Sequence, residues 1–263
     1  MIDIHHHCLP GVDDGPRDVA EAVELCRAAA EEGIETIVCT PHVLRGRWQN
    51  TSRVELERRM TELQSALGDT PRLLLGSEYF FAHDINETLQ SGTGIIPLAG
   101  SRYVLIELES HTVPPMIEQP LYRMQLDGWT PILAHPERNQ TLQARPELLA
   151  KLVQAGVRTQ VTAESFTGRF GEAAEKAARQ MLAANLVHFV ASDAHNLKRR
   201  PPYVRPALEI IGELAGEAVV DALARRNPLC VIEHRPLEYE PDPAPPREEG
   251  GFLRRLRQFL GAS

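Results

Sequence analysis

Histidines and carboxylates recur along this chain where short apolar runs end. Imidazole and carboxylate groups without cysteine thiolates suit Zn, Mn or Fe, and the mixture does not determine which of them binds. Nine candidates are too many for one ion, so we expect a cluster of two or three metals, in which carboxylates bridge the cations. The candidate ligands are His5, His7, His42, Glu78, Glu107, His135, Asp193 and His195, together with Asp13 or Asp14 in the loop after the first run.

Arginines follow several of these ligands and suggest an anionic substrate. Arg138 lies three residues after His135, and Arg200 lies five residues after His195. Guanidinium groups match phosphate oxygens in a bidentate fashion. Metal clusters of this kind stabilise the attacking and leaving oxygens in phosphoryl displacement and lower the pKa of a bound water. We therefore expect phosphate ester hydrolysis, with Arg138 and Arg200 binding the phosphate.

The segment after the second apolar run allows other interpretations. Arg45 and Arg47 follow His42, and Trp48 either walls the pocket or is a half-buried core aromatic. The stretch CTPHVLR (39–45) also has the Cys-x5-Arg spacing of cysteine-dependent phosphatases, in which a thiolate attacks phosphorus. Pro41 lacks an N–H group and no glycine allows a tight phosphate-binding loop, so we reject the thiolate mechanism.

The elements that must position these residues alternate along the chain. Apolar runs too uniform to alternate, separated by segments of helical periodicity, indicate parallel strands buried on both faces. This pattern predicts an α/β fold, a distorted (β/α)7 barrel, in which strand carboxyl ends converge on one face. An open doubly wound sheet is the alternative. The predicted strands are 1–5, 34–40, 72–78, 102–109, 130–135, 157–164 and 186–193; the predicted helices are 17–33, 52–68, 116–128, 146–156 and 171–185.

Strand alternation separates the three histidines near the start of the chain. His5 and His7 point the same way, whereas His6 points to the opposite face. In the following loop, Asp13 and Asp14 are both candidates: one is expected to be a ligand, and the other to lie in the loop or beside a ligand. Glycines 33, 68, 128 and 156 are expected to end helices.

Composition limits the class of protein. The chain has 263 residues, 43% of them hydrophobic, and a formal net charge of −8, which argues against nucleic-acid binding. The four cysteines are scattered, with no C-x-x-C pair, which favours a reducing compartment over a disulfide framework. No stretch reads as a signal peptide or a membrane span, so we expect a cytoplasmic protein.

The end of the chain differs from the rest. We expect a single barrel domain over 1–234, a Pro- and Glu-rich linker over 235–251 and a short amphipathic basic tail over 252–263. The tail has two interpretations. One is a terminal helix that docks on its own barrel or on a neighbouring subunit of a homo-oligomer. The other is a helix, over 252–260, that binds a membrane surface or a partner.

Taken together, the motifs resemble the polymerase and histidinol phosphatase (PHP) superfamily. Within it, the chain looks like the manganese-dependent protein-tyrosine phosphatases of bacterial capsule and exopolysaccharide loci, with a similarity that extends over about residues 1–233. The motifs are DIHHH (3–7), DDG (13–15), TPH (40–42), GSE (76–78), IELE (106–109), AHPER (134–138) and ASDAHN (191–196).

The resemblance implies a trinuclear site, with Mn expected and Fe, Zn or Co as alternatives. It implies one ion held by His5, His7, Glu78 and Asp193, a second held by Glu78, Glu107 and His135, and a third held by Asp14, His42 and His195. It also implies that Arg138 and Arg200 grip a phosphotyrosyl protein, typically the tail of a partner tyrosine kinase. We expect attack without a covalent intermediate, and either a metal-bound water or His42 as the proton source.

The chain departs from the family pattern at a few positions. His6 and Cys8 flank the first motif, and Thr162–Ala163–Glu164 stands where relatives carry an Asn and small polar residues. The roles of these residues stay open.

Other functions fit part of the pattern. A small-molecule phosphatase related to histidinol phosphatases, or a nuclease, would use the same metals. A silent barrel that regulates a kinase by binding it is a second alternative, disfavoured by the complete set of ligands. A purely structural role for the histidines would bury many uncompensated carboxylates, which is costly.

Overall fold

The computed structural model describes residues 1–244. The predicted basic tail (252–263), with its membrane or partner interpretation, and residues 245–251 of the predicted linker lie outside the described residues.

Each of the seven predicted strand segments contains a strand. Two further short strands were not predicted: β3, which lies beyond segment 34–40, and β5, which begins at the last residue of segment 72–78. Pro41, which has no N–H group, separates β2 from β3. Gly76 separates β4 from β5, and a Cβ atom there would lie 2.9 Å from Leu98 Cδ2. The strands are β1 (Ile2–His6), β2 (Thr36–Cys39), β3 (His42–Val43), β4 (Arg72–Leu75), β5 (Glu78–Phe80), β6 (Tyr103–Glu107), β7 (Thr130–Ala134), β8 (Arg158–Thr162) and β9 (Phe189–Ala191).

All five predicted helices are present, and their ends follow local capping rules. Asp18 accepts a hydrogen bond from Glu21 N, and Ser52 accepts one from Glu55 N. The four glycines predicted to end helices have φ between +83° and +95°. The predicted helices are α1 (Val19–Glu31), α2 (Arg53–Leu67), α4 (Glu118–Leu126), α6 (Pro146–Gln154) and α7 (Glu172–Ala183).

Further short helices were not predicted. Several lie in the connections that follow strands, and α8, α9, η4 and α10 follow one another in the last part of the described chain. Their bounds are α3 (Ile85–Ser91), η1 (Leu98–Gly100), η2 (Pro136–Arg138), α5 (Gln140–Ala144), η3 (Ala163–Ser165), α8 (Arg205–Ala215), α9 (Glu217–Asp221), η4 (Ala222–Arg226) and α10 (Asn227–Ile232).

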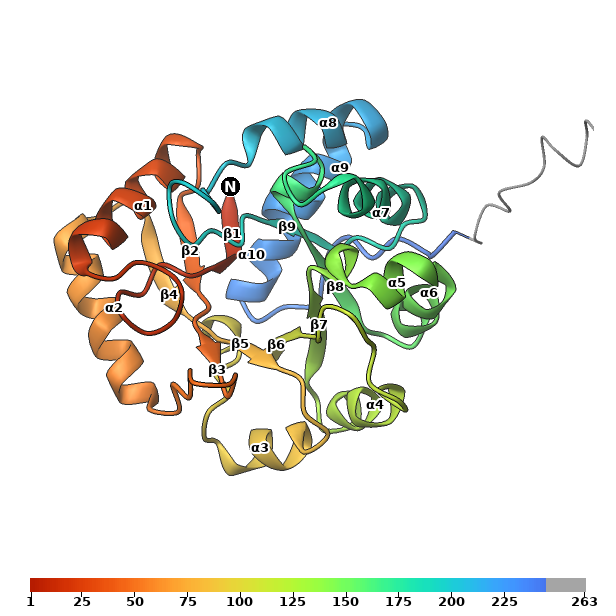
Figure 1. Ribbon diagram of the computed structural model, residues 1–263, viewed down its shortest axis with the longest axis horizontal. Coiled ribbons are helices and arrows are strands. Elements are labelled where there is room, and N and C mark those ends of the chain that lie inside the picture. Colours follow the sequence, from red (N-terminus) through yellow and green to blue (C-terminus); the bar gives the residue numbers. More distant parts are fainter. Residues whose placement is uncertain (245–263) are drawn as a thin grey trace, which may run out of the picture.

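Parallel pairing carries the strands around a ring. One sheet has the order β1-β2-β4 and the other β3-β5-β6-β7-β8-β9, and every pair is parallel. The two sheets meet beyond β9, where Asp193 N donates to His5 O (2.8 Å) and His7 N donates to Ala194 O (2.9 Å). Figure 1 shows the strands around the centre of the molecule, with helices α1 to α8 outside them. The predicted α/β class with parallel strands is confirmed, whereas closure into a distorted barrel stays a prediction.

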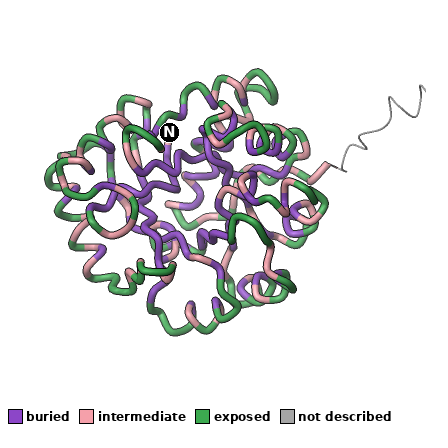
Figure 2. The backbone as a smooth tube through the Cα atoms, in the orientation of Figure 1, coloured by how far each residue is buried: buried purple, intermediate pink, exposed green. Residues whose placement is uncertain are grey.

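The core lies on both sides of the strands, as Figure 2 shows by the buried centre and the exposed outer helices. Alternate residues of β6, β7 and β9 form an apolar cluster with Val231 of α10. The cluster reaches the last residues of β7 and β9, Ala134 and Ala191, and the polar residues His135 and Asp193 follow within two positions of these strand ends.

The first residues of the predicted linker lie against the barrel. Tyr103 Oη donates to Arg235 O at 2.7 Å, Asn227 Nδ2 donates to Tyr239 O at 2.7 Å, and Ala244 N donates to Ala184 O at 2.9 Å. Residues 235–244 therefore pack along the molecule. None of the helices within residues 1–244 is long and apolar enough to cross a membrane.

Candidate metal centre

The nine predicted ligands meet at the carboxyl ends of the strands. Within residues 1–244, four groups of His and carboxylate side chains have ligand atoms within 4.8 Å of one another, and these groups contain the nine predicted residues and no others. Seven of the nine side chains are buried, His135 is half-buried and Asp14 is exposed. The groups are His7, Asp14, His42 and His195; His5, Glu78 and His135; His5, His7 and Asp193; and His42, Glu78 and Glu107.

The grouping differs in detail from the three sets implied by the resemblance. His7 joins the group around Asp14, and His42 rather than His135 joins Glu78 and Glu107. His135 Nε2 is 2.9 Å from Glu78 Oε1 but 3.9 Å from Glu107 Oε1. The structure brings the whole set together, and the assignment of each residue to one ion stays a prediction.

Glu78 is the centre of the arrangement. Its Oε1 atom lies 2.9 Å from His135 Nε2 and 3.3 Å from His5 Nε2. Its Oε2 atom lies 2.8 Å from His42 Nδ1 and 3.3 Å from His7 Nε2. Burial opposes the charged form, but His5 and His42 outweigh it and hold the pKa of Glu78 well below its usual range. A single carboxylate thus faces four imidazoles, as a bridging ligand would.

Buried lone pairs at the centre lack hydrogen bonds and fit a cation. Glu78 Oε2, Glu107 Oε2 and Asp193 Oδ1 are buried. Each has a cationic or imidazole nitrogen within 2.8–3.2 Å, but none makes a well-oriented hydrogen bond within the described chain. Such atoms are costly to leave unsatisfied. Burial and the neighbouring Glu78 also raise the pKa of Glu107 to about 8. Positive charge between these oxygens would satisfy the lone pairs and remove the repulsion between the carboxylates, so the residues present suit a metal cluster.

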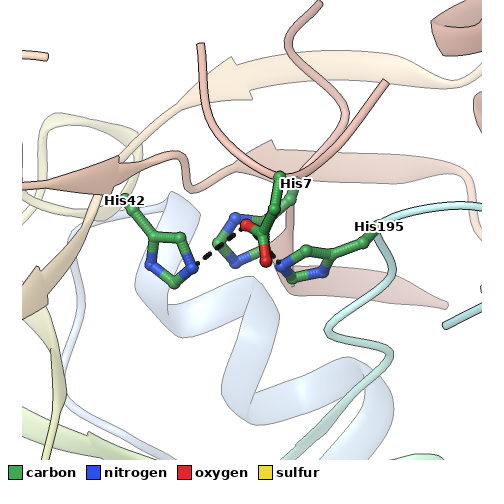
Figure 3. Close-up of side chains that lie close together, drawn as sticks. His7, His42 and His195 are labelled. Atoms are coloured by element: carbon green, nitrogen blue, oxygen red, sulfur yellow. Dashed lines mark ion pairs between the residues drawn. The ribbon is translucent and has the colours of Figure 1, made fainter. Parts of the chain in front are cut away.

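Figure 3 shows His7, His42 and His195 around a carboxylate, with dashed lines marking ion pairs. Asp14 Oδ1 lies 3.4 Å from His42 Nε2 and 3.3 Å from His195 Nε2. The His7 and His195 rings stack with centroids 3.8 Å apart. Three imidazoles and one carboxylate that face one point form an N/O donor set typical of a divalent transition metal.

Two further residues orient the first histidines. His5 Nδ1 lies 2.7 Å from Gln160 Oε1, and His7 Nδ1 lies 2.8 Å from Asp13 Oδ2. These contacts leave the two Nε2 atoms facing each other at 3.1 Å, free to bind metal. Sequence analysis missed Gln160. Its strand, β8, also contains Arg158, Thr159 and Thr162, so a polar residue at this position gave no distinctive signal.

Asp13 gives a direct test of this orientation. We expect Asp13→Asn to weaken metal binding by about 10–100-fold, because the amide can donate to His7 Nδ1 and move the imidazole proton onto Nε2. Competition with a chelating dye would measure the affinity. Asp69→Asn, at an exposed position, is the control. Equal affinities for the two variants would show that Asp13 does not orient His7.

Left-handed backbone turns direct two ligands into the centre. His135, directly after β7, has φ +35°, and Asp193, two residues after β9, has φ +54°. Non-glycine residues in this region are uncommon and cluster at functional sites, because their strain must be compensated by surrounding contacts. These turns let the residues that follow β7 and β9, the two neighbours of β8, face the same point.

Arg138 and Arg200 lie at the edge of the centre, and both form ion pairs with Asp193 Oδ2. Their Nε atoms are buried without a hydrogen-bond partner in the described part of the chain. The adjoining cavity has a volume of about 200 Å³, and both guanidiniums line it with His42, Glu107 and His135. Two guanidinium groups that line one small cavity are suited to bind a phosphate group.

The loop after β3 also reaches the cavity. Arg45 Nη1 lies 3.0 Å from Glu107 Oε2 and 2.7 Å from His42 Nε2, so Arg45 contacts the centre more directly than the sequence indicated. The Trp48 ring stacks on His42 with centroids 5.3 Å apart, whereas Arg47 is exposed and packs over Trp48. Trp48 is half-buried and covers a predicted ligand.

Cys39 is fully buried and cannot serve as a nucleophile for a substrate in the cavity. Its Sγ atom lies 3.3 Å from Cys8 Sγ, and neither residue lines the cavity. We expect Cys39→Ser to keep activity on p-nitrophenyl phosphate within about threefold of the parent, since the change touches only packing. Steady-state kinetics would measure it. Complete loss of activity in a folded, metal-loaded variant would favour the thiolate mechanism instead.

The comparison with protein families agrees with this geometry. A family model described as capsular polysaccharide synthesis, CpsB/CapC, matches residues 1–233. The chain belongs to the CpsB/CapC family. The matched range contains every predicted ligand and both arginines of the cavity.

Similar CpsB/CapC proteins are named as tyrosine phosphatases. Tyrosine-protein phosphatase YwqE of Bacillus subtilis is 34% identical over 96% of this chain and 100% of its own length. Putative tyrosine-protein phosphatase CapC of Staphylococcus aureus is 38% identical over 76% of this chain and 79% of its own. Tyrosine-protein phosphatase CpsB of Streptococcus pneumoniae is 34% identical over 88% of this chain and 98% of its own.

Solved structures agree. One chain from the crystal structures of Bacillus subtilis YwqE and Streptococcus pneumoniae CpsB, described as unique metal-dependent tyrosine phosphatases, superposes with a TM-score of 0.89. It is 34% identical and covers 94% of this chain and 100% of its own. A lactonase from Listeria monocytogenes, 12% identical with a TM-score of 0.53 over 89% of this chain and 94% of its own, shares the fold alone.

Proposed function

We propose that this CpsB/CapC chain is a metal-dependent phosphatase that hydrolyses phosphotyrosine in proteins. The observation that carries the proposal is the convergence of nine His and carboxylate ligands beside two guanidiniums in one cavity. Relatives named as tyrosine phosphatases, which match this chain over most of its length, support the substrate class.

The nine residues would hold three divalent ions, with Glu78 bridging. We propose Mn, with Fe, Zn and Co as the alternatives that reconstitution distinguishes, because the imidazole and carboxylate set does not select among them. When bound, the metals supply positive charge that stabilises the attacking and leaving oxygens and lowers the pKa of water.

The protein's own residues have separate roles in binding the phosphate and holding the metals. Arg138 and Arg200 bind and orient the phosphate and neutralise its equatorial oxygens. His42 has one ring nitrogen facing Glu78 and the other facing Asp14, at 2.8 and 3.4 Å. Burial opposes protonation of His42, but Glu78 and Asp14 outweigh it and raise its pKa to about 10. Because both nitrogens face ligand carboxylates, we propose that His42 is a metal ligand rather than the proton donor.

We further propose that the substrate is the tyrosine kinase that regulates capsule or exopolysaccharide synthesis. The family description, capsular polysaccharide synthesis, supports this biological role. All four cysteines are free and buried, which supports a reducing compartment such as the cytoplasm.

The decisive experiment is metal reconstitution with three substrates. After EDTA treatment and addition of Mn, Zn, Fe or Co, we expect recovery of turnover on a phosphotyrosyl peptide, with Mn most effective. Histidinol phosphate and an oligonucleotide should be poor substrates. Preferred turnover of histidinol phosphate would establish the small-molecule phosphatase alternative.

The same assay addresses the non-catalytic alternative. A protein that binds metals stoichiometrically yet turns over none of the three substrates would be a regulator that acts by binding. Full activity of the EDTA-treated protein would remove the metal mechanism altogether.

A further inference from the structure

The connection between β8 and α7 contacts the turn that precedes Arg200 and the side chain of Arg138, the two arginines that line the cavity. It runs from Ala163 through η3 to Gly171, and its first acidic residue, Glu164, is only 5% exposed. None of its residues belongs to the metal-ligand groups described above. Its contacts with the neighbouring loops indicate a role in positioning residues of the cavity rather than in binding metal.

One contact reaches the turn that carries Arg200. Glu164 Oε2 lies 3.2 Å from Arg169 Nε. The same guanidinium donates to two main-chain carbonyls, from Nε to Arg199 O at 3.1 Å and from Nη2 to Lys198 O at 2.8 Å. Asn196 holds this turn from within, because its Oδ1 accepts from Lys198 N at 3.2 Å and Arg199 N at 2.8 Å. Arg169 therefore ties the residues just before Arg200 to the β8–α7 connection.

A second contact reaches Arg138. Its guanidinium carbon lies 4.6 Å from the centre of the Phe170 ring. A guanidinium over an aromatic face at this distance is attracted to the ring. Hydrogen bonds also tie the start of this connection to the residue before Arg138. The buried Glu137 side chain accepts one from Ser165 Oγ at 2.6 Å and one from Thr162 N at 3.1 Å.

We propose that Arg169 and Phe170 of the β8–α7 connection are positioning residues that hold Arg200 and Arg138, respectively, in the geometry that binds the phosphate group. This inference rests on the proposed function only for the identity of the bound group. An arginine side chain has high rotamer entropy, and fixing it before the ligand arrives removes that cost from binding. Both arginines line the cavity in this arrangement.

The test measures phosphate binding rather than turnover. Metal-loaded full-length protein is titrated with inorganic phosphate by calorimetry, for the parent and for Arg169→Ala and Phe170→Leu. We expect each substitution to weaken phosphate binding about tenfold, with unchanged metal content. Phe170→Tyr keeps an aromatic face and should bind like the parent, and Arg169→Lys, which cannot donate to both carbonyls as a fork, should lie between. Arg53→Ala, which removes an ion pair with Glu57 on α2, is the matched control.

Double-mutant cycles show whether each residue acts through its arginine. In the Arg138→Ala background, Phe170→Leu should have almost no further effect, and in the Arg200→Ala background, Arg169→Ala should have almost none. Unchanged phosphate affinity in the single variants, or additive losses in the cycles, would overturn the proposal, as would a loss of metal. Calorimetry also keeps the proposals apart, because a parent protein that binds phosphate but hydrolyses no phosphotyrosyl peptide contradicts the proposed function alone.

Discussion

Glu78→Gln is expected to lower kcat on p-nitrophenyl phosphate by at least about 10³-fold and to reduce metal content. The change keeps the shape of the side chain but removes the charge that four imidazoles face. An amide can supply one oxygen to a cation but cannot bridge two with both of its atoms, and it leaves the cations less well compensated. Kinetics after loading with Mn, together with elemental analysis of the dialysed protein, measure both effects.

The matched control for Glu78→Gln is Glu57→Gln. Glu57 is a half-exposed carboxylate on α2 that pairs with Arg53 at 2.7 Å, far in sequence from any ligand. It should retain parental activity and metal content. If Glu78→Gln binds three ions with full turnover, Glu78 is not a bridging ligand. Thermal unfolding with and without Mn adds a second readout, because a ligand that binds only the folded state raises its stability.

Arg138→Ala should lower kcat/KM for a phosphotyrosyl peptide by about 10²–10³-fold and leave the metal content unchanged. This is the size of effect found when one preorganised donor to a developing negative charge is removed. The Arg138 side chain is 18% exposed, lines the cavity and pairs with Asp193. It can therefore contact a phosphate in the cavity while it keeps its ion pair with Asp193. Arg138→Lys keeps the charge but not the fork, and it should recover only part of the activity.

Arg145→Ala controls for the loss of an arginine near the same loop. The Arg145 side chain is 63% exposed and pairs with Glu147 at 3.3 Å, away from the cavity. Arg145→Ala should leave both kcat/KM and the metal content unchanged. A loss of less than fivefold for Arg138→Ala would mean that this arginine stabilises Asp193 and does not bind the phosphate. Loss of metal in the variant would mean that it maintains the centre.

Strand positions and ligand identity were accessible from the sequence because both depend on local pattern. Uniform apolar runs such as 102–109 predict a strand buried on both faces, and β6 is fully buried. The carboxyl ends of parallel strands must meet on one side, so residues as distant as His5 and His195 could be assigned to one site. Alternation in a strand separated His5 and His7 from His6, which belongs to none of the ligand groups in residues 1–244.

The helices that went unpredicted show the limit of this reasoning. α5 and α9 span five residues each, too short for periodicity to stand out, and α10 carries a proline among its first residues. α8 has a clear apolar face but also begins with a proline, and it lies where sequence analysis assigned no element. Such segments are stabilised by tertiary packing more than by their own propensity.

The sequence by itself determined the class of fold, because strand periodicity is a local property of the chain. Residue types at the strand ends, with the family resemblance, predicted nine metal ligands and two phosphate-binding arginines, and the structure brings these residues together. Only the tertiary structure decided how these residues are grouped around Glu78, which side chains orient them, and what supports the arginines. Gln160 beside His5 and Phe170 beneath Arg138 are examples. Such contacts join segments distant in sequence, and their distances depend on how the strand ends and loops pack together.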